Sequence, residues 1–340
     1  MTEQSKIPLP SEDKGKSLFE RAESLFGFAS PGVPAELAAA PAKRGGKTAS
    51  APGKDTPQTV EARSEPAGPS VPPEPSAPAF APPPEPEPGE KPVVFGGERY
   101  KVDRKHLARQ GLIQPDGKVT ALLEEFRIVK RQLLLAVRDA RAKGAGDRAQ
   151  RVLICSPLPG EGKTFCATNL ALALAAEKDS EVVLVDADFA KPSILSTLGL
   201  PGGRGLMDAL ADPAIRVEDC VIATDIPGFY VLPAGNPTNS DSEYLASDRT
   251  AAVLDRLTRG TPGRIVIFDS PPALAATPAA ELSKHVGQAL VVVRADTTGQ
   301  AALEDALSLL ADCPEIRLLL NAAHYSPSGR RFGTYYGYGE

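Results

Sequence analysis

The chain has 340 residues, a net charge of −5, four cysteines and three histidines. The negative charge gives no support to a nucleic-acid-binding surface, so we expect no nucleic-acid partner. The cysteines lack CxxC spacing, which argues against a zinc site or a disulfide framework and fits a reducing cytoplasm. No run of about 18 apolar residues is present, so we expect membrane association only through a partner or a surface helix.

Residues 1–30 are expected to form a short amphipathic segment. Within residues 16–28, one helical face would carry Leu18, Phe19, Ala22, Leu25 and Phe26. Two interpretations stay open for this stretch. It is either a short, frayed helix or a helix that docks on a partner or a membrane surface.

Residues 31–100 are expected to be a disordered linker. Residues 31–92 hold 17 of the 34 prolines, together with many Ala, Gly, Ser and Glu residues. Such a composition buries too little apolar surface to offset the entropy of ordering the chain. The globular domain is therefore predicted at residues 101–325, followed by a flexible tail at 326–340.

A long amphipathic helix is predicted at residues 119–142. Its apolar positions recur every three or four residues, at Leu122, Phe126, Val129, Leu133 and Val137. A different strip of the same helix carries Glu124, Arg127 and Lys130. The sequence KGAGD at 143–147 is predicted to end the helix.

From residue 150 onward, short apolar runs alternate with helical patterns. The expected strands are 151–155, 182–186, 229–235, 264–269, 288–295 and 316–322, and a helix is expected from about 163 to 177. Continuous apolar strands of this kind predict an α/β fold with a mainly parallel sheet and helices on both faces.

The clearest local motif runs from Ser156 to Thr164 and reads SPLPGEGKT. It follows a strand and opens a helix, which is the context of a phosphate-binding P-loop. Gly160 and Gly162 allow backbone amides to approach phosphate oxygens, and the start of the helix adds a positive dipole end. Lys163 is expected to bind phosphate and Thr164 to bind Mg²⁺. The expected nucleotide-binding set also includes Glu161 and Phe165, whereas Pro157 replaces the usual first glycine.

Acidic residues end two of the predicted strands. Asp186 and Asp188 follow VVLV, and Asp269 follows RIVIF at a position like that of a Walker B aspartate. All are expected at the carboxyl edge of the sheet, where open α/β sheets bind ligands. One carboxylate would hold Mg²⁺, and another would accept the proton of an attacking hydroxyl.

Tyrosines are concentrated at the C-terminus. Tyr325, Tyr335, Tyr336 and Tyr338 lie within the last 16 residues, the last three of them in the Gly-rich stretch GTYYGYGE. A segment so rich in glycine does not fold alone, so these hydroxyls are expected to be accessible. A tail that packs on the domain is the alternative.

Together these motifs resemble the bacterial tyrosine kinases (BY-kinases) of exopolysaccharide and capsule export. The P-loop resembles their Walker A motif, VDADFAKPS their Walker A′ and IFDSPP their Walker B. Segments such as EEFRIVKRQLL, GLMDAL, LPAGNP, IFDSPPALAAT and HVGQALVVVRA are similar to the exosortase-associated autokinase subgroup. The Walker A′ arginine of the family is replaced by Ala190, with Lys191 after it.

The resemblance implies a role for each matching position. Lys163, Asp186 and Asp188 would be catalytic, with Asp188 as the base or a second metal contact. Thr164, Asp186 and Asp269 would hold Mg²⁺, and Asn321 would contact the base of ATP. Glu124, Arg127 and Lys130 would match an E-x-x-R-x-x-R oligomerisation motif, with a lysine in its last place that cannot reproduce a bidentate guanidinium contact.

The resemblance further implies an ATP- and Mg²⁺-dependent autokinase that phosphorylates its own C-terminal tyrosines in trans. Its expected partners are other copies of itself in a ring, a membrane chain-length regulator in a separate polypeptide and a cognate tyrosine phosphatase. Recruitment to the inner face of the plasma membrane would then regulate exopolysaccharide synthesis and export.

Two other functions remain open. A partitioning or septum-positioning ATPase switch shares the fold, but such proteins usually carry a lysine where this chain has Leu158. The second alternative is a scaffold that binds ATP without catalysis and docks on an export machine.

Overall fold

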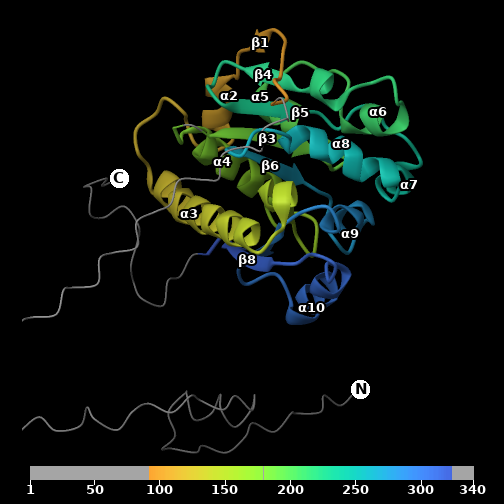
Figure 1. Cartoon of the computed structure of the whole chain (residues 1–340). Coiled ribbons are helices and arrows are strands. Elements are labelled where there is room, and N and C mark those ends of the chain that lie inside the picture. The colour runs from red at the N-terminus through yellow and green to blue at the C-terminus, as the bar shows by residue number, and fades with distance from the viewer. Residues whose placement is uncertain (1–91, 179, 324–340) are drawn as a thin grey trace, which may run out of the picture. The chain divides into compact units, whose positions relative to one another are not determined.

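A computed structural model of the chain describes residues 92–178 and 180–323 (Figure 1). The expected helix at 16–28, the linker up to residue 91 and all four tail tyrosines lie outside the described residues. Secondary structure in this part of the chain alternates between strands and helices, as the sequence predicts.

The described residues form an eight-stranded sheet in the order β1-β4-β5-β3-β6-β2-β7-β8. Neighbouring strands are parallel except for β4 and β5, which are antiparallel. The strands are β1 (Arg99–Tyr100), β2 (Arg151–Cys155), β3 (Glu181–Asp186), β4 (Ile222–Thr224), β5 (Phe229–Leu232), β6 (Arg264–Asp269), β7 (Gln288–Arg294) and β8 (Ile316–Asn321).

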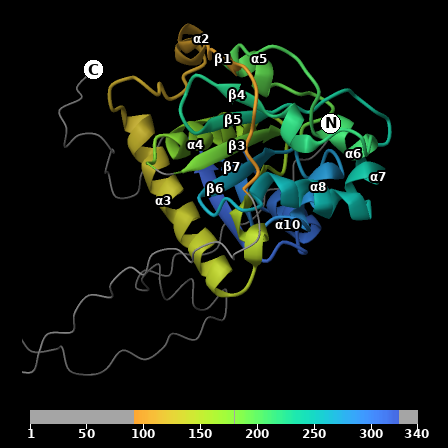
Figure 2. The ribbon, with the colours of Figure 1, turned by 45° about the horizontal axis from the view of Figure 1, so that its top comes forward.

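Helices cover both faces of this sheet. They are α2 (Arg104–Arg109), α3 (Ala121–Ala142), α4 (Lys163–Ala175), α5 (Ile194–Leu198), α6 (Leu206–Ala211), α7 (Asp241–Leu245), α8 (Asp248–Thr258), α9 (Pro278–Ser283) and α10 (Gln300–Leu309), with 3₁₀ turns η1 (Gly146–Gln150) and η2 (Val217–Cys220). Figure 2 shows α3 on one side of the sheet and α6, α8 and α10 on the other.

Alternate residues of each central strand enter two separate cores. In β2, Val152 and Ile154 join the core under α3 and α4, whereas Leu153 and Cys155 join the core under α6 to α10. Strands that are buried on both faces must be apolar throughout, which explains the continuous runs in the sequence. The central strands are therefore rigid supports for the loops at their carboxyl ends.

Helix α3 begins at a side-chain cap and buries one apolar face. The Thr120 hydroxyl accepts a hydrogen bond from the Leu123 amide at 3.2 Å and caps the first turn. Phe126, Leu133 and Val137 are buried beneath the helix. Predicted bounds of 119–142 and observed bounds of 121–142 therefore differ only at the first turn.

An N-terminal strap, residues 92–100, packs on the sheet, although the sequence assigns these residues to the linker. Phe95 is buried, meets Tyr230 edge-on at 5.1 Å between ring centroids and lies 4.0 Å from the Arg264 guanidinium carbon. The Val93 carbonyl accepts a hydrogen bond from Arg264 at 2.8 Å. The ordered domain thus begins earlier than the predicted residue 101, because one phenylalanine provides an apolar anchor.

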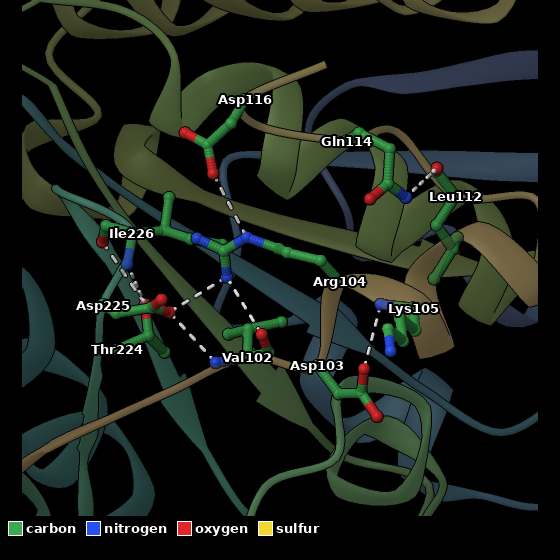
Figure 3. A network of polar contacts seen from close by, with 10 residues as sticks. All are labelled: Val102, Asp103, Arg104, Lys105, Leu112, Gln114, Asp116, Thr224, Asp225 and Ile226. Atoms are coloured by element: carbon green, nitrogen blue, oxygen red, sulfur yellow. Dashed lines mark hydrogen bonds and ion pairs between the residues drawn. The ribbon is translucent and has the colours of Figure 1, made fainter.

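A polar clasp fastens the end of the strap to the turn after β4 (Figure 3). One Asp225 carboxylate oxygen accepts from the Val102 amide and from Arg104 Nη1, both at 3.0 Å. Burial alone would raise the pKa of Asp225, but these two donors lower it below the usual range. The charged aspartate therefore holds β1 against β4.

Candidate active site

The loop between β2 and α4 has the backbone of a phosphate cradle. Gly160 and Gly162 have φ angles of 80° and 93°, a region that side chains other than glycine rarely adopt. Gly162 is the N-cap of α4 and offers no side chain to the first amides of the helix. Those amides, at the positive end of the helix dipole, are available to an anion.

Glu161 and its neighbours hold this loop in place. Its side chain is buried and accepts hydrogen bonds from the Leu158 amide at 2.7 Å and from the Thr298 hydroxyl. Arg294 donates to the Gly160 carbonyl at 3.0 Å. Glu161 therefore holds the loop from within, and Arg294 at the end of β7 and Thr298 in the following turn hold it from the neighbouring strand.

Asp186 and Asp269 end adjacent strands and are register partners in the β3–β6 pair. Both carboxylate oxygens of Asp269 are buried and have no hydrogen-bond partner among the described residues. Burial raises the pKa of Asp269 to about 7, although the nearby Thr164 hydroxyl and Lys163 ammonium oppose the rise. A buried carboxylate in this state is satisfied by a proton or by a cation.

The Asp186 carboxylate, unlike that of Asp269, accepts hydrogen bonds from backbone amides. Its Oδ2 accepts from the Ser193 and Ile194 amides, both at 2.9 Å, and its Oδ1 accepts from the Asp188 amide at 3.3 Å. Burial raises its pKa to about 6, and these amide bonds oppose that rise. Asp186 thus shapes the loop that leads into α5.

Asp188 lies just beyond the end of β3 and faces the P-loop. Its Oδ2 is 3.3 Å from the Lys163 ammonium, and its Oδ1 accepts from the Lys191 amide at 3.1 Å. Both side chains of the Lys163–Asp188 pair are largely buried. The aspartates and the P-loop lysine, far apart in the sequence, therefore meet at one edge of the sheet.

These residues fit a Mg²⁺–nucleotide complex. Asp269 offers two unpartnered buried oxygens, and Gly160 leaves open space where a side chain would stand. No group of three or more His, Cys, Asp or Glu residues suited to a metal ion occurs among the described residues. Mg²⁺ normally takes one or two carboxylates and completes its ligands with phosphates and waters, so this acidic set matches a nucleotide-borne ion.

An apolar pocket of about 470 Å³ adjoins the P-loop. Phe165 and Asn321 line it, together with Phe126 and Val129 of α3. Asn321 Nδ2 donates to the Glu161 carbonyl at 2.8 Å, and a methyl group at Gly162 would lie 2.2 Å from the same nitrogen. Asn321 therefore contacts the P-loop itself as well as the pocket where a base is expected.

The two cysteines beside the P-loop are free and buried. Burial raises the pKa of Cys155 and of Cys166 to about 12 in each case. Their thiolates are therefore scarce at neutral pH, which excludes an easily oxidised pair at this site.

The expected oligomerisation residues form ion pairs within the chain. Arg127 pairs with Glu124 one turn away on α3, and Lys130 pairs with Glu177 just beyond α4. Thr298 and Arg294 were absent from the sequence-derived site. Arg294 is the last residue of β7 and Thr298 lies in the turn after it, neither belongs to a motif, and only the fold brings them to the P-loop.

Comparison with known proteins finds similarity to tyrosine-protein kinases. The chain is 31% identical over 217 residues to the tyrosine-protein kinase wzc of Salmonella typhimurium, covering 64% of this chain and 28% of wzc. It is 28% identical over 197 residues to the tyrosine-protein kinase YwqD of Bacillus subtilis, covering 56% of this chain and 76% of YwqD. Over the matched residues the chain is therefore similar to bacterial tyrosine-protein kinases.

The relationship extends to the tyrosine-protein kinase ptk of Acinetobacter johnsonii, at 29% identity over 182 residues, 54% of this chain and 23% of ptk. The chain thus spans about a quarter of the length of ptk and of wzc. No protein-family model matches it.

Among solved structures, the chimerical protein CapA2B2 has a similar fold, with a TM-score of 0.51 and 24% identity over 68% of this chain and 94% of that chain. The mainly parallel sheet with helices on both faces agrees with the fold class that the sequence predicts. Within residues 92–178 and 180–323, no helix has the length and apolar character needed to cross a bilayer.

Proposed function

We propose that the chain is an ATP-dependent protein-tyrosine autokinase that uses Mg²⁺ and phosphorylates its own C-terminal tyrosines in trans. The observation that carries this proposal is the buried, unpartnered Asp269 carboxylate beside the open amides of α4 and the Lys163 ammonium. Relationship to tyrosine-protein kinases supports tyrosine as the acceptor.

Each residue at the sheet edge has a distinct task in this reaction. Bound Mg²⁺–ATP would supply the γ-phosphoryl group and offset the charge on its oxygens. The P-loop amides and Lys163 bind the phosphates, whereas Thr164 and Asp269 hold the metal. Asp186 holds the Walker A′ loop in position through its three amide hydrogen bonds. It also lies beside Asp269, where it would contact the metal ion through water.

Asp188 is the proposed base. Its Oδ2 pairs with Lys163, and a bound triphosphate would draw the lysine towards its own oxygens. Asp188 would then have a carboxylate oxygen available for the phenolic proton. The tyrosine oxygen bonds to the γ-phosphorus as the bond to the β–γ bridging oxygen breaks, and the proton passes to Asp188.

The proposed acceptors are Tyr325, Tyr335, Tyr336 and Tyr338, which all lie outside the described residues. Asn321, the last residue of β8, contacts the P-loop, so the chain enters the tail close to the nucleotide site. A tail on a neighbouring copy would reach the same edge in a ring held by Glu124, Arg127 and Lys130. Each phosphotyrosine would add about −1.5 to −2 charges and weaken docking near the acidic residues.

We place this kinase at the inner face of the plasma membrane, recruited by a separate membrane chain-length regulator that activates it. In this setting it would regulate exopolysaccharide synthesis and export, with a cognate phosphatase to reset the tail. The exosortase-associated subgroup, suggested by the segments around Arg127 and Asp269, belongs to the same proposal.

Incubation of the purified chain with ATP and Mg²⁺, followed by phosphotyrosine mapping by mass spectrometry, tests the activity. We expect phosphate on the tail, and loss of the signal in Lys163→Met, in Asp269→Asn and after removal of residues 334–340. ATP hydrolysis without phosphotyrosine would instead indicate a nucleotide switch. Nucleotide binding with neither activity, even with the membrane partner present, would indicate a scaffold.

A further inference from the structure

An arginine-lined groove lies on the face opposite α3, between α8 and the residues before and within η2. It has a volume of about 280 Å³ and is lined by Arg216, Arg249, Arg256 and Arg259, with Ile215 and Val253 among the apolar residues. Arg249 and Arg256 are seven residues apart on α8 and share one helical face. The groove therefore combines an apolar floor with guanidinium groups.

The groove retains positive charge after its internal ion pairs are formed. Arg216 pairs with Asp219, and Arg256 pairs with Glu218. Arg249 instead donates to the carbonyl oxygens of Ala209 and Asp212, at 2.9 and 3.1 Å. No carboxylate forms an ion pair with Arg249 in the described part of the chain. Its charge is therefore not offset by a neighbouring anion, and an acidic ligand would be attracted.

The described chain begins beside this groove. The Val93 amide donates to the carbonyl of Arg259, a lining residue, at 3.3 Å. The residues just before it, 84–90, read PEPEPGE and carry Glu85, Glu87 and Glu90. Glu90 is three residues from Val93, so its backbone lies within about 10 Å of that contact in any conformation. Even Glu85 is at most about 27 Å away along an extended chain.

We propose that residues 84–90 of the same chain dock in this groove, with their glutamates against Arg249 and its arginine neighbours and their prolines on Ile215 and Val253. Proline fixes the backbone in advance, so the segment loses less entropy on docking than a Gly/Ser-rich tether would. The segment is acidic, the groove is basic, and the chain connects them directly.

Docking in this groove would fix the point at which the N-terminal linker leaves the domain. Arg264, which holds Val93, begins β6, whereas Asp269 ends the same strand. The contact of Val93 with Arg259 and Arg264 therefore lies at the opposite edge of the sheet from Asp269, about 17 Å away along this strand.

A nitroxide label on the full chain tests this docking. The label is attached at Pro86→Cys, with Ala62→Cys as the reference site, because the four native thiols are buried and resist labelling. Electron paramagnetic resonance should give a several-fold longer rotational correlation time at position 86 than at position 62. Arg249→Ala and Arg259→Glu should each shorten it, whereas Arg109→Glu, an equal charge change on α2, should leave it unchanged.

Salt provides a second measurement that needs no change in the groove. About 1 M NaCl, where the Debye length is about 3 Å, should release the labelled segment. Equal, fast motion at both positions at low salt would overturn the proposal. Slow motion that survives both salt and the arginine variants would show that another surface holds the segment. Slow motion that disappears on dilution would assign the groove to a second copy of the chain.

Discussion

The environment of Asp269 makes the apo site sensitive to pH. Burial raises its pKa to about 7, whereas an unfolded aspartate titrates near about 3.9. The protonated form therefore favours the fold, and this contribution is full below the unfolded value and is lost as pH rises through about 7. Asp186, with a pKa of about 6, acts in the same direction.

We predict that Asp269→Asn stabilises the nucleotide-free chain at pH 8 by on the order of 1–3 kcal/mol, because it removes a buried, unpaired charge. The same variant should lose the thermal stabilisation that Mg²⁺–ATP gives the wild type. Chemical denaturation at pH 6 and pH 8 measures the first effect, and melting with nucleotide measures the second. Asp225→Asn is the control, since its donors lower the native pKa and its loss should destabilise. Equal destabilisation by both variants would contradict the assignment.

Glu161 is predicted to act through the shape of the P-loop. Glu161→Ala removes the acceptor of the Leu158 amide and the Thr298 hydroxyl. ATP affinity should fall about tenfold, or about 1.4 kcal/mol, because the loop amides lose their fixed geometry. Thr298→Val should weaken binding less, and Glu177→Ala, away from the P-loop, should not. Calorimetric titration with nucleotide measures the affinity of all three variants. Unaltered affinity in Glu161→Ala would contradict a role for Glu161 in holding the P-loop.

At the scale of the element, we expect Arg127 and Lys130 of α3 to have different roles. Lys130 pairs with Glu177, so Lys130→Ala should cost about 0.5–1 kcal/mol of stability. Arg127 pairs with Glu124 on its own helix, so Arg127→Glu should spare stability but abolish self-assembly. Light scattering and thermal melting distinguish these effects, with Lys143→Glu at the end of the same helix as the control. Normal assembly of Arg127→Glu would remove α3 from the proposed interface.

The strap should contribute strongly to stability. Phe95→Ala removes a buried ring that contacts Tyr230 and Arg264, and we expect a loss of about 2–4 kcal/mol. Its neighbour Val94 is 77% exposed, so Val94→Ala should cost less than about 0.5 kcal/mol. Urea denaturation of the two variants provides the comparison. Similar, small losses would mean that the strap does not belong to the folding unit.

The central elements were predictable because their signals are local. Strands such as β2 and β6 are uniformly apolar, and the P-loop glycines precede a helix. The antiparallel β4 and the strap were missed, since β4 has only three residues and the strap depends on Phe95 alone. The sequence placed Asp186, Asp188 and Asp269 at one edge. It did not indicate the Lys163–Asp188 pair or the Thr298 contact, which arise from tertiary packing.

At the scale of the whole molecule, we propose a nucleotide site at the carboxyl edge of the sheet and acceptor tyrosines in the residues that follow β8. The proposed transfer occurs between copies. A copy that cannot bind ATP productively should therefore still accept phosphate, and a copy without its tail should still donate it. Neither partner alone should yield phosphotyrosine in residues 334–340.

The most direct measurement mixes the full-length Lys163→Met chain with a chain that ends at residue 333, in the presence of ATP and Mg²⁺. We predict phosphotyrosine at Tyr335, Tyr336 or Tyr338 of the longer chain, detected by mass spectrometry, and its loss when the shorter chain also carries Asp269→Asn. Absence of phosphate on the longer chain, while the wild type alone becomes phosphorylated on its tail, would contradict transfer in trans. Absence of phosphate on the wild type as well, with its membrane activator present, would contradict the kinase assignment itself.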